Sequence, residues 1–178
     1  MAYLFVGLAL FPRWTVDDAY ITYRYAENLA RHGEFVFNVG EDPVEGYTGV
    51  LLPVVVAGAV AAGADADSAS KVVGSACAIA MVLLLYFAAR TAGVRAWIAG
   101  AAALVFAATP SVLTHALGGL ETMLFAALVL ASVWTLARAI DEPASDTRLA
   151  GSLVALLLTC LARPEGAALA APSLAALA

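Results

Sequence analysis

The sequence predicts an all-α fold, a polytopic bundle of transmembrane helices, because it is apolar, poor in charge and divided into runs of helix length. The chain has 178 residues, of which 63% are hydrophobic and 13% charged, and its mean hydropathy is +0.90. Soluble domains have about 45–50% apolar and about 25% charged residues, so this composition is typical of an integral membrane protein. The net charge of -5 and the single lysine argue against a nucleic-acid-binding face.

The apolar runs are rich in Ala, Leu, Val and Gly, which suits closely packed membrane helices. We expect spanning helices over 71–89, 96–113, 120–137 and 149–161. The runs 1–12 and 166–178 are shorter than the ~20 residues that cross a bilayer. We therefore interpret them as truncated spans, and the chain as the N-terminal part of a larger membrane domain that is inactive without the rest.

The run 49–63 differs from the other internal runs. It has about 15 residues, contains Pro53 and is followed by the acidic stretch "ADAD", features that favour an interfacial or re-entrant helix over a full span. We expect it to lie at the membrane surface without crossing.

Arginines in two short loops predict which ends of the spans face the cytoplasm. These arginines are Arg90, Arg95, Arg138 and Arg148. Because cytoplasmic loops are enriched in Lys and Arg, "GGLET" at 118–122 and "RPEG" at 163–166 should lie on the other face. The polar segment 13–48 is harder to place. Its own arginines favour the cytoplasm, whereas a run 49–63 that does not cross would put it outside with "GGLET".

The sequence predicts a helix over 15–32. Thr15 followed by Asp18 resembles a capping box, and Gly33 is suited to end the helix. One stripe of this helix is apolar or aromatic and fits a membrane surface: Ile21, Tyr25 and Leu29. We expect an amphipathic juxtamembrane helix here.

Asp17 and Asp18 are the first candidates for chemistry. Neighbouring carboxylates repel each other, which raises the pKa of one of them and suits a general base. Acidic residues at a helix start are also common simply as caps, so spacing alone leaves both interpretations open.

Two further motifs place charged residues where apolar runs meet. Glu121 in "GGLETM" follows two glycines, and an acid at membrane depth is costly enough that it usually has a function; in an exposed turn it is only a helix-start acid. Arg163 and Glu165 in "ARPEG" occupy a similar boundary and form either part of a site or a local ion pair. The two cysteines and two histidines show no metal-ligand spacing, and we expect no metal and no cofactor.

These motifs together resemble a known family. "DDAYITYRYAENLARHGEFVFNVGEDPVEGYTG", then "TPSVLTHALGGLET", then "LARPEG" are similar to the membrane-embedded GT-C glycosyltransferases, which use polyprenyl-phosphate sugars as donors. The likeness is greatest to the branch of terminal arabinofuranosyltransferases and more remote to the aminoarabinose and protein O-mannosyl transferases. It covers about residues 14 to 170.

The resemblance implies a fold, a location and a reaction. The acidic loop would be external and carry the juxtamembrane helix, 49–63 would lie on the outer leaflet, and the motifs would converge on one external cavity of a multi-pass plasma-membrane protein. The enzyme would move a sugar from a polyprenyl-phosphate donor to a cell-envelope glycan, lipid or protein acceptor.

The resemblance also implies roles for individual residues. Asp17 would deprotonate the acceptor hydroxyl, and Asp18 would orient either Asp17 or the acceptor. Arg24 and Arg163 would bind the donor phosphate, and Glu121 would contact the sugar or the acceptor. The full set of implied donor- and acceptor-binding residues is Tyr20, Arg24, Glu45, Tyr47, Glu121, Arg163 and Glu165.

Two other classes of protein compete with this interpretation. A transporter or lipid-linked-sugar translocase would use its carboxylates as proton or cation relays, but it would place them near the bilayer midplane in broken helices. The acids of this chain cluster at the ends of the expected spans instead. In a non-catalytic membrane protein, the acidic pair would be a helix cap and nothing more.

Overall fold

The computed structural model describes residues 14–141 and 145–177, and the regular secondary structure of this part of the chain is entirely helical, without strands. The helices are α2 (Ala19–His32), α3 (Leu51–Ala61), α4 (Ala66–Thr91), α5 (Ala96–Ala107), α6 (Pro110–Leu117), α7 (Thr122–Asp141), α8 (Asp146–Ala162), the 3-10 turn η1 (Pro164–Gly166) and α9 (Ala167–Leu177). The all-α prediction is confirmed for these residues. The expected truncated span over 1–12 lies outside them.

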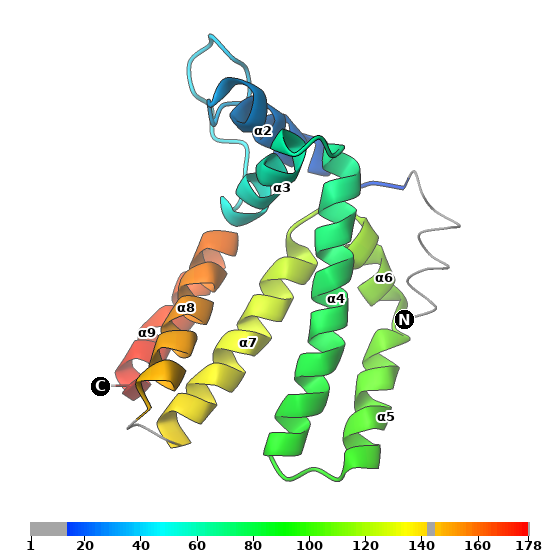
Figure 1. The fold of residues 1–178 in the computed structure, drawn as a ribbon, viewed down its shortest axis with the longest axis vertical. Helices are drawn as coiled ribbons and strands as arrows, with labels where there is room; N and C mark the ends of the chain where they lie inside the picture. Colours follow the sequence, from blue (N-terminus) through cyan, green and yellow to red (C-terminus); the bar gives the residue numbers. More distant parts are fainter. Residues whose placement is uncertain (1–13, 142–144, 178) are drawn as a thin grey trace.

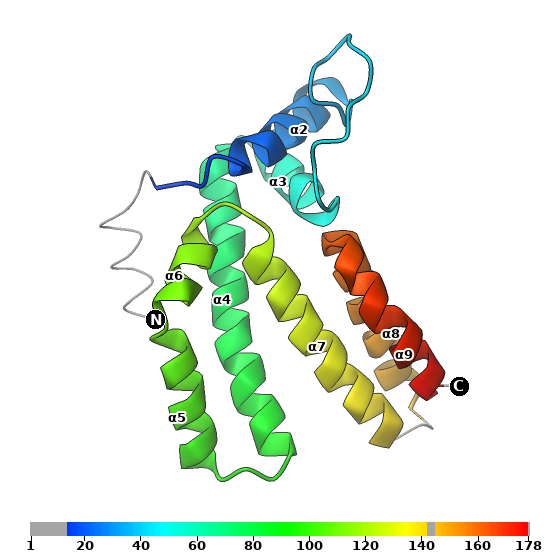
Figure 2. The same cartoon turned by 180° about the vertical axis from the view of Figure 1, so that it is seen from behind.

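The helices form a bundle that is covered at one end. The helices α4, α5, α7, α8 and α9 run along the long axis, and α2 and α3 cross one end of them (Figures 1 and 2). We call this the polar end, because α2, the α6–α7 turn and η1 lie there. The α4–α5 turn with Arg90 and Arg95 lies at the opposite end, which we call the arginine end.

Two of these helices, α4 and α7, are long and apolar enough to cross a membrane, and α5 with α6 would make a third span if the pair is one bent span. Their outer faces carry large apolar side chains that no other helix covers, which indicates a lipid environment. Exposed examples on α4, α5, α7 and α8 are Val72, Leu83, Phe87, Trp97, Leu104, Val105, Val133, Leu153, Val154 and Leu157.

The remaining expected spans stay predictions. The helix α8 has 17 residues, at the lower limit for a crossing helix. The helix α3 has 11 residues, or about 16 Å of helix, roughly half the thickness of the hydrocarbon core. Its length suits the interfacial position that we expect for 49–63.

The run 96–113, for which we expect one spanning helix, is divided between two helices, α5 and α6. The chain bends by 58° between α5 and α6. Thr109 has the extended backbone angles φ -69° and ψ 124°, and Pro110 is the first residue of α6. A proline removes one backbone donor and disfavours the helical conformation of the residue before it, so the break follows from Pro110.

The helix α4 begins earlier than the run 71–89 predicts. Asp65 caps it, accepting a hydrogen bond from the backbone N–H of Ser68 on Oδ2 at 2.9 Å. The polar stretch that separates the apolar runs is therefore the first turn of α4, and it brings Asp67 and Lys71 into the helix.

The helix α2 begins and faces differently from the prediction, although Gly33 ends it as predicted, with φ 73°. The capping box is wrong: Asp18 occupies the N-cap position without a side-chain cap hydrogen bond, and the Thr15 hydroxyl donates to Asp67 instead. The stripe does not face lipid either. Tyr25 is fully buried, and Leu29 packs against the core of α2, α3 and α4.

We predict that α4 crosses the membrane, which labelling at its two ends will test. Asp65→Cys and Ala92→Cys, each in a background with Cys77→Ser and Cys160→Ser, should react with a membrane-impermeant thiol reagent from opposite faces. Ala92 follows the last residue of α4, and Asp65 precedes its first. Labelling of both positions from one face would contradict the crossing.

Candidate functional site

The loop between α2 and α3 is folded back over α2. The Asn28 side-chain amide donates to the backbone carbonyls of Val36 and Phe37, at 2.9 Å each. The Tyr25 hydroxyl donates to the carbonyl of Val44 and accepts from the N–H of Gly46 at 3.0 Å. These bonds hold the "EGYTG" segment beside α2.

The α6–α7 turn is fixed against the start of α2. The backbone N–H of Val16 donates to the carbonyl of Gly118 at 3.0 Å. Gly119 has φ +83°, and a Cβ there would lie 2.1 Å from the Tyr23 hydroxyl oxygen. Only glycine fits this conformation and this approach. The turn therefore carries Leu120, Glu121 and Thr122 to the side of Asp18.

The end of α8 meets the start of α3. The N–H of Val50 donates to the carbonyl of Leu161 at 3.1 Å, and a Cβ on Gly49 would lie 1.9 Å from the carbonyl oxygen of Ala162. Arg163 directly follows this contact. Its extended backbone, with φ -156° and ψ 145°, separates α8 from η1.

These contacts surround a cavity of about 390 Å³ at the polar end, which we call the central cavity. Its lining comes from four separate stretches of sequence: Asp18, Ile21 and Thr22; Gly46, Tyr47, Thr48 and Gly49; Leu120, Glu121 and Thr122; and Arg163. Segments of "DDAYIT", "EGYTG", "GLET" and "RPEG" thus lie around one space. The hydroxyl, carboxylate and guanidinium groups of this lining can form hydrogen bonds with sugar hydroxyls, and the guanidinium can also bind an anion.

An ion-pair cluster occupies one wall of this cavity. Arg163 lies 3.1 Å from Glu165 (Nη2 to Oε1) and 3.8 Å from Glu121 (Nε to Oε1). The Glu121 side chain is 13% exposed and that of Arg163 is 29% exposed. A backbone hydrogen bond within η1, together with Arg163, lowers the pKa of Glu165. Arg163 therefore already has two carboxylate partners.

A second cavity, of about 480 Å³, adjoins the first, and we call it the outer cavity. It is lined by Asp17, Asp18, Tyr20, Ile21, Arg24, Phe37 and Asn38. Arg24 is exposed and donates to the Phe37 carbonyl at 3.0 Å and to Asn38 Oδ1 at 3.4 Å. Both of these partners are neutral, and Arg24 forms no direct ion pair with any carboxylate in the part of the chain that the structure describes.

The predicted site residues divide between the two cavities. Asp18, Tyr47, Glu121 and Arg163 line the central cavity, and Asp17, Asp18, Tyr20 and Arg24 line the outer one. Asp18 borders both. Glu45 and Glu165 are exposed and do not belong to either lining.

The side chain of Asp18, at the N-cap position of α2, is not used to cap the helix. Asp17 and Asp18 are exposed, and Asp18 at the N-cap position forms no side-chain cap hydrogen bond. The two carboxylates are therefore open to a ligand in the cavities that they line.

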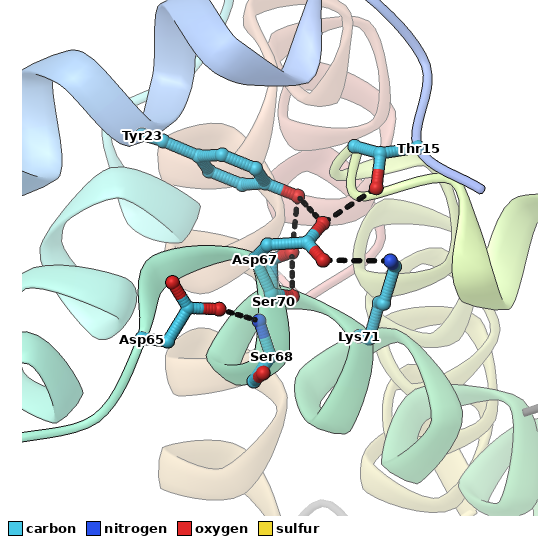
Figure 3. A network of polar contacts seen from close by, with 7 residues as sticks. All are labelled: Thr15, Tyr23, Asp65, Asp67, Ser68, Ser70 and Lys71. Atoms are coloured by element: carbon cyan, nitrogen blue, oxygen red, sulfur yellow. Dashed lines mark hydrogen bonds and ion pairs between the residues drawn. The ribbon is translucent and has the colours of Figure 1, made fainter. Parts of the chain in front are cut away.

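Sequence reasoning missed a polar network next to this site. Thr15 and Lys71 converge on Asp67, and Tyr23 reaches both Asp67 and Ser70 (Figure 3). Burial raises the pKa of the Tyr23 hydroxyl above its ordinary value, so it remains a donor. The signal was present: the only lysine of the chain stands four residues after an aspartate, at the start of an apolar run.

Among the described residues, no group of three or more His, Cys, Asp or Glu side chains is placed to hold a metal ion. No family model, curated protein or solved structure matches the chain. The assignment of a function therefore depends on the geometry of the two cavities and on the motifs that line them.

Proposed function

We propose that the chain is part of an integral-membrane glycosyltransferase that transfers a sugar from a polyprenyl-phosphate donor to a cell-envelope acceptor. The central cavity is the observation that carries this proposal. It gathers Asp18, Glu121 and Arg163, which are far apart in the sequence, at one end of a set of membrane-length helices. A lipid-linked donor needs this location, because its polyprenyl chain remains in the bilayer while its sugar enters the site.

Group transfer requires two substrates that meet at the reacting atoms, and two cavities that meet at a carboxylate suit this requirement. Asp18 lines both cavities, whereas Asp17 lines the outer one. This position supports Asp18 as the general base and Asp17 as its neighbour, the reverse of the order that the resemblance implies.

The charges favour Arg24 over Arg163 as the residue that binds the donor phosphate. Arg163 is paired with Glu121 and Glu165, so a phosphate would have to displace a carboxylate there. Arg24 is held by neutral oxygens and faces the outer cavity. Glu121 and Arg163 are left to bind hydroxyl groups of the sugar or the acceptor.

In the proposed reaction, the Asp18 carboxylate takes the proton of an acceptor hydroxyl. The hydroxyl oxygen then attacks the anomeric carbon of the sugar. The bond between that carbon and the phosphate oxygen breaks, and polyprenyl phosphate leaves with the bonding electrons. Arg24 stabilises the negative charge that develops on the phosphate.

The active site is proposed to lie on the external face. The polar end and the arginine end are at opposite ends of α4 and α7, and arginine-rich loops favour the cytoplasm. The polar end would then be external, with α3 in the outer leaflet.

One observation favours a translocase as a second candidate. The break between α5 and α6 resembles the discontinuous helices of transporters. The acidic residues, however, line the cavities at the polar end. A translocase would move the lipid-linked sugar between leaflets without forming a glycosidic product, so product formation separates the two classes.

The test is sugar transfer by purified full-length protein from a polyprenyl-phosphate sugar to an envelope acceptor, with Arg24→Gln as the diagnostic variant. Loss of a charge-assisted hydrogen bond costs about 1.5–3 kcal/mol, so donor affinity should fall by about 10-fold or more. Arg31→Gln is the matched control, since Arg31 is exposed on the same helix and outside both cavities. Transbilayer movement of the donor without product would identify a translocase, and unchanged donor affinity in Arg24→Gln would contradict the phosphate assignment.

A further inference from the structure

The first turn of α4 contains a carboxylate, Asp67, whose two oxygens both accept hydrogen bonds. Asp67 Oδ1 accepts from the Thr15 hydroxyl at 2.6 Å and from the Tyr23 hydroxyl at 3.2 Å. Its Oδ2 lies 2.7 Å from the Lys71 ammonium, whose side chain is 6% exposed. Figure 3 shows these side chains directed at Asp67 from the entry to α2, from α2 itself and from α4.

The Tyr23 hydroxyl lies at the junction of three segments. It is 2.6 Å from the Ser70 hydroxyl of α4, and it packs so closely on Gly119 that a Cβ there would lie 2.1 Å away. Gly119 is two residues before Glu121. The same hydroxyl thus touches α4 and the turn that carries Glu121.

Thr15 ties the other acidic segment to the same place. It is two residues before Asp17, and its bond to Asp67 spans 52 positions of sequence. The intervening residue, Val16, donates its backbone N–H to Gly118. Both the Asp17–Asp18 segment and the Glu121 turn are therefore attached to the start of α4.

A partly buried ion pair of this kind contributes little net stability, because the loss of hydration offsets much of the attraction. Its geometric effect is larger. With three donors on one carboxylate, the network is satisfied in one arrangement, and a shift of either segment leaves a polar group without its partner.

We infer that Thr15, Tyr23 and the Asp67–Lys71 pair are positioning residues. They hold Asp18 and Glu121 in fixed positions relative to each other across the central cavity. For its effect on catalysis this inference rests on the proposed glycosyltransferase function. The fixed relative position of the two segments is a property of the fold, and it can be measured even if the protein shows no transfer activity.

The test compares Tyr23→Phe and Asp67→Asn with matched controls in the full-length protein. Tyr86→Phe removes a tyrosine hydroxyl from α4, the helix that carries Asp67, at a position well away from the network. Asp65→Asn changes the acid two residues before Asp67 and keeps a residue type that caps helices well. Hydrogen exchange at 14–22 and 118–124 measures how firmly the two segments are held, with the Val16 amide as reporter.

Tyr23→Phe and Asp67→Asn should speed exchange in both segments and leave α8 and the rest of α7, from 125 onward, unchanged. They should also lower kcat by about 10- to 100-fold with the donor KM nearly constant. Thr15→Val should do the same, and Thr15→Ser, which retains the hydroxyl, should restore the wild-type values. Neither control should alter exchange or turnover. Wild-type exchange and kcat in Tyr23→Phe and Asp67→Asn would overturn the inference. If the wild-type protein transfers no sugar, the proposed function fails. Hydrogen exchange alone still decides whether the network holds the two segments in place.

Discussion

Asp18→Asn is expected to abolish most sugar transfer, whereas Asp17→Asn should retain much more of it. Asparagine keeps the size and hydrogen-bonding shape of aspartate but lacks the basic oxygen. A general base contributes about 10²–10⁴-fold to rate, and Asp18 is the carboxylate that borders both cavities. Turnover under saturating donor and acceptor measures the effect.

The two aspartates are good controls for each other. Both are exposed, and Asp18 makes no cap hydrogen bond, so neither substitution should destabilise α2. Donor binding, which is measured separately, should remain close to the wild-type value. A loss confined to Asp17→Asn would exchange the two roles, as the resemblance implies. Near wild-type turnover in both variants would remove the acidic pair from the chemistry.

The position of these acids shows which parts of the site local sequence can predict. The helix after Asp18 and its end at Gly33 follow from periodicity and from the conformational freedom of glycine. The capping box did not form, because α2 begins only after Asp18, three residues beyond Thr15, and the Thr15 hydroxyl donates to a residue 52 positions away. A spacing rule describes only neighbours along the chain, so it cannot register a competitor from another helix.

Two other features of the fold are predictable from the sequence, although we did not predict them. Pro110 stands inside the run 96–113, and its missing N–H breaks that run into α5 and α6. Asp67 and Lys71 have i,i+4 spacing, which predicts a pair on one helix face. The burial of that pair was not predictable, since it depends on Thr15 and Tyr23 packing over it.

The arrangement of the cavities depends on tertiary contacts that motifs alone do not specify. The resemblance implied one cavity for Asp17 and Glu121, whereas the structure places Asp18 on the central cavity and Asp17 on the outer one. Neighbouring residues at the start of a helix point about 100° apart. A motif that names the pair does not say which member faces inward.

The joint between α3 and α8 is expected to be the most sensitive point of the fold to a single added methyl group. In Gly49→Ala the new Cβ would lie 1.9 Å from the carbonyl oxygen of Ala162, 2.5 Å from its carbonyl carbon and 3.1 Å from the carbonyl oxygen of Leu161. All three are backbone atoms, which have no alternative rotamer. The helices must separate, and the hydrogen bond from Val50 to Leu161 stretches with them.

Overpacking of this kind typically costs about 1–3 kcal/mol of unfolding free energy, which lowers the midpoint of a chain of this size by several degrees. Because Gly49 also lines the central cavity and Arg163 directly follows Ala162, transfer activity should fall even below the unfolding temperature. Thermal unfolding in detergent and turnover at low temperature measure the two effects separately.

Gly58→Ala provides the comparison within α3. A Cβ at Gly58 would meet no atom within 4 Å, and alanine favours a helix over glycine by about 1 kcal/mol. Its midpoint should therefore equal or exceed that of the wild type, with turnover unchanged. Unfolding of Gly49→Ala at the wild-type temperature, with transfer at the wild-type rate, would contradict this prediction. It would mean that the backbone of Gly49 does not lie against the carbonyl of Ala162, and that α3 does not hold the wall of the central cavity that carries Arg163.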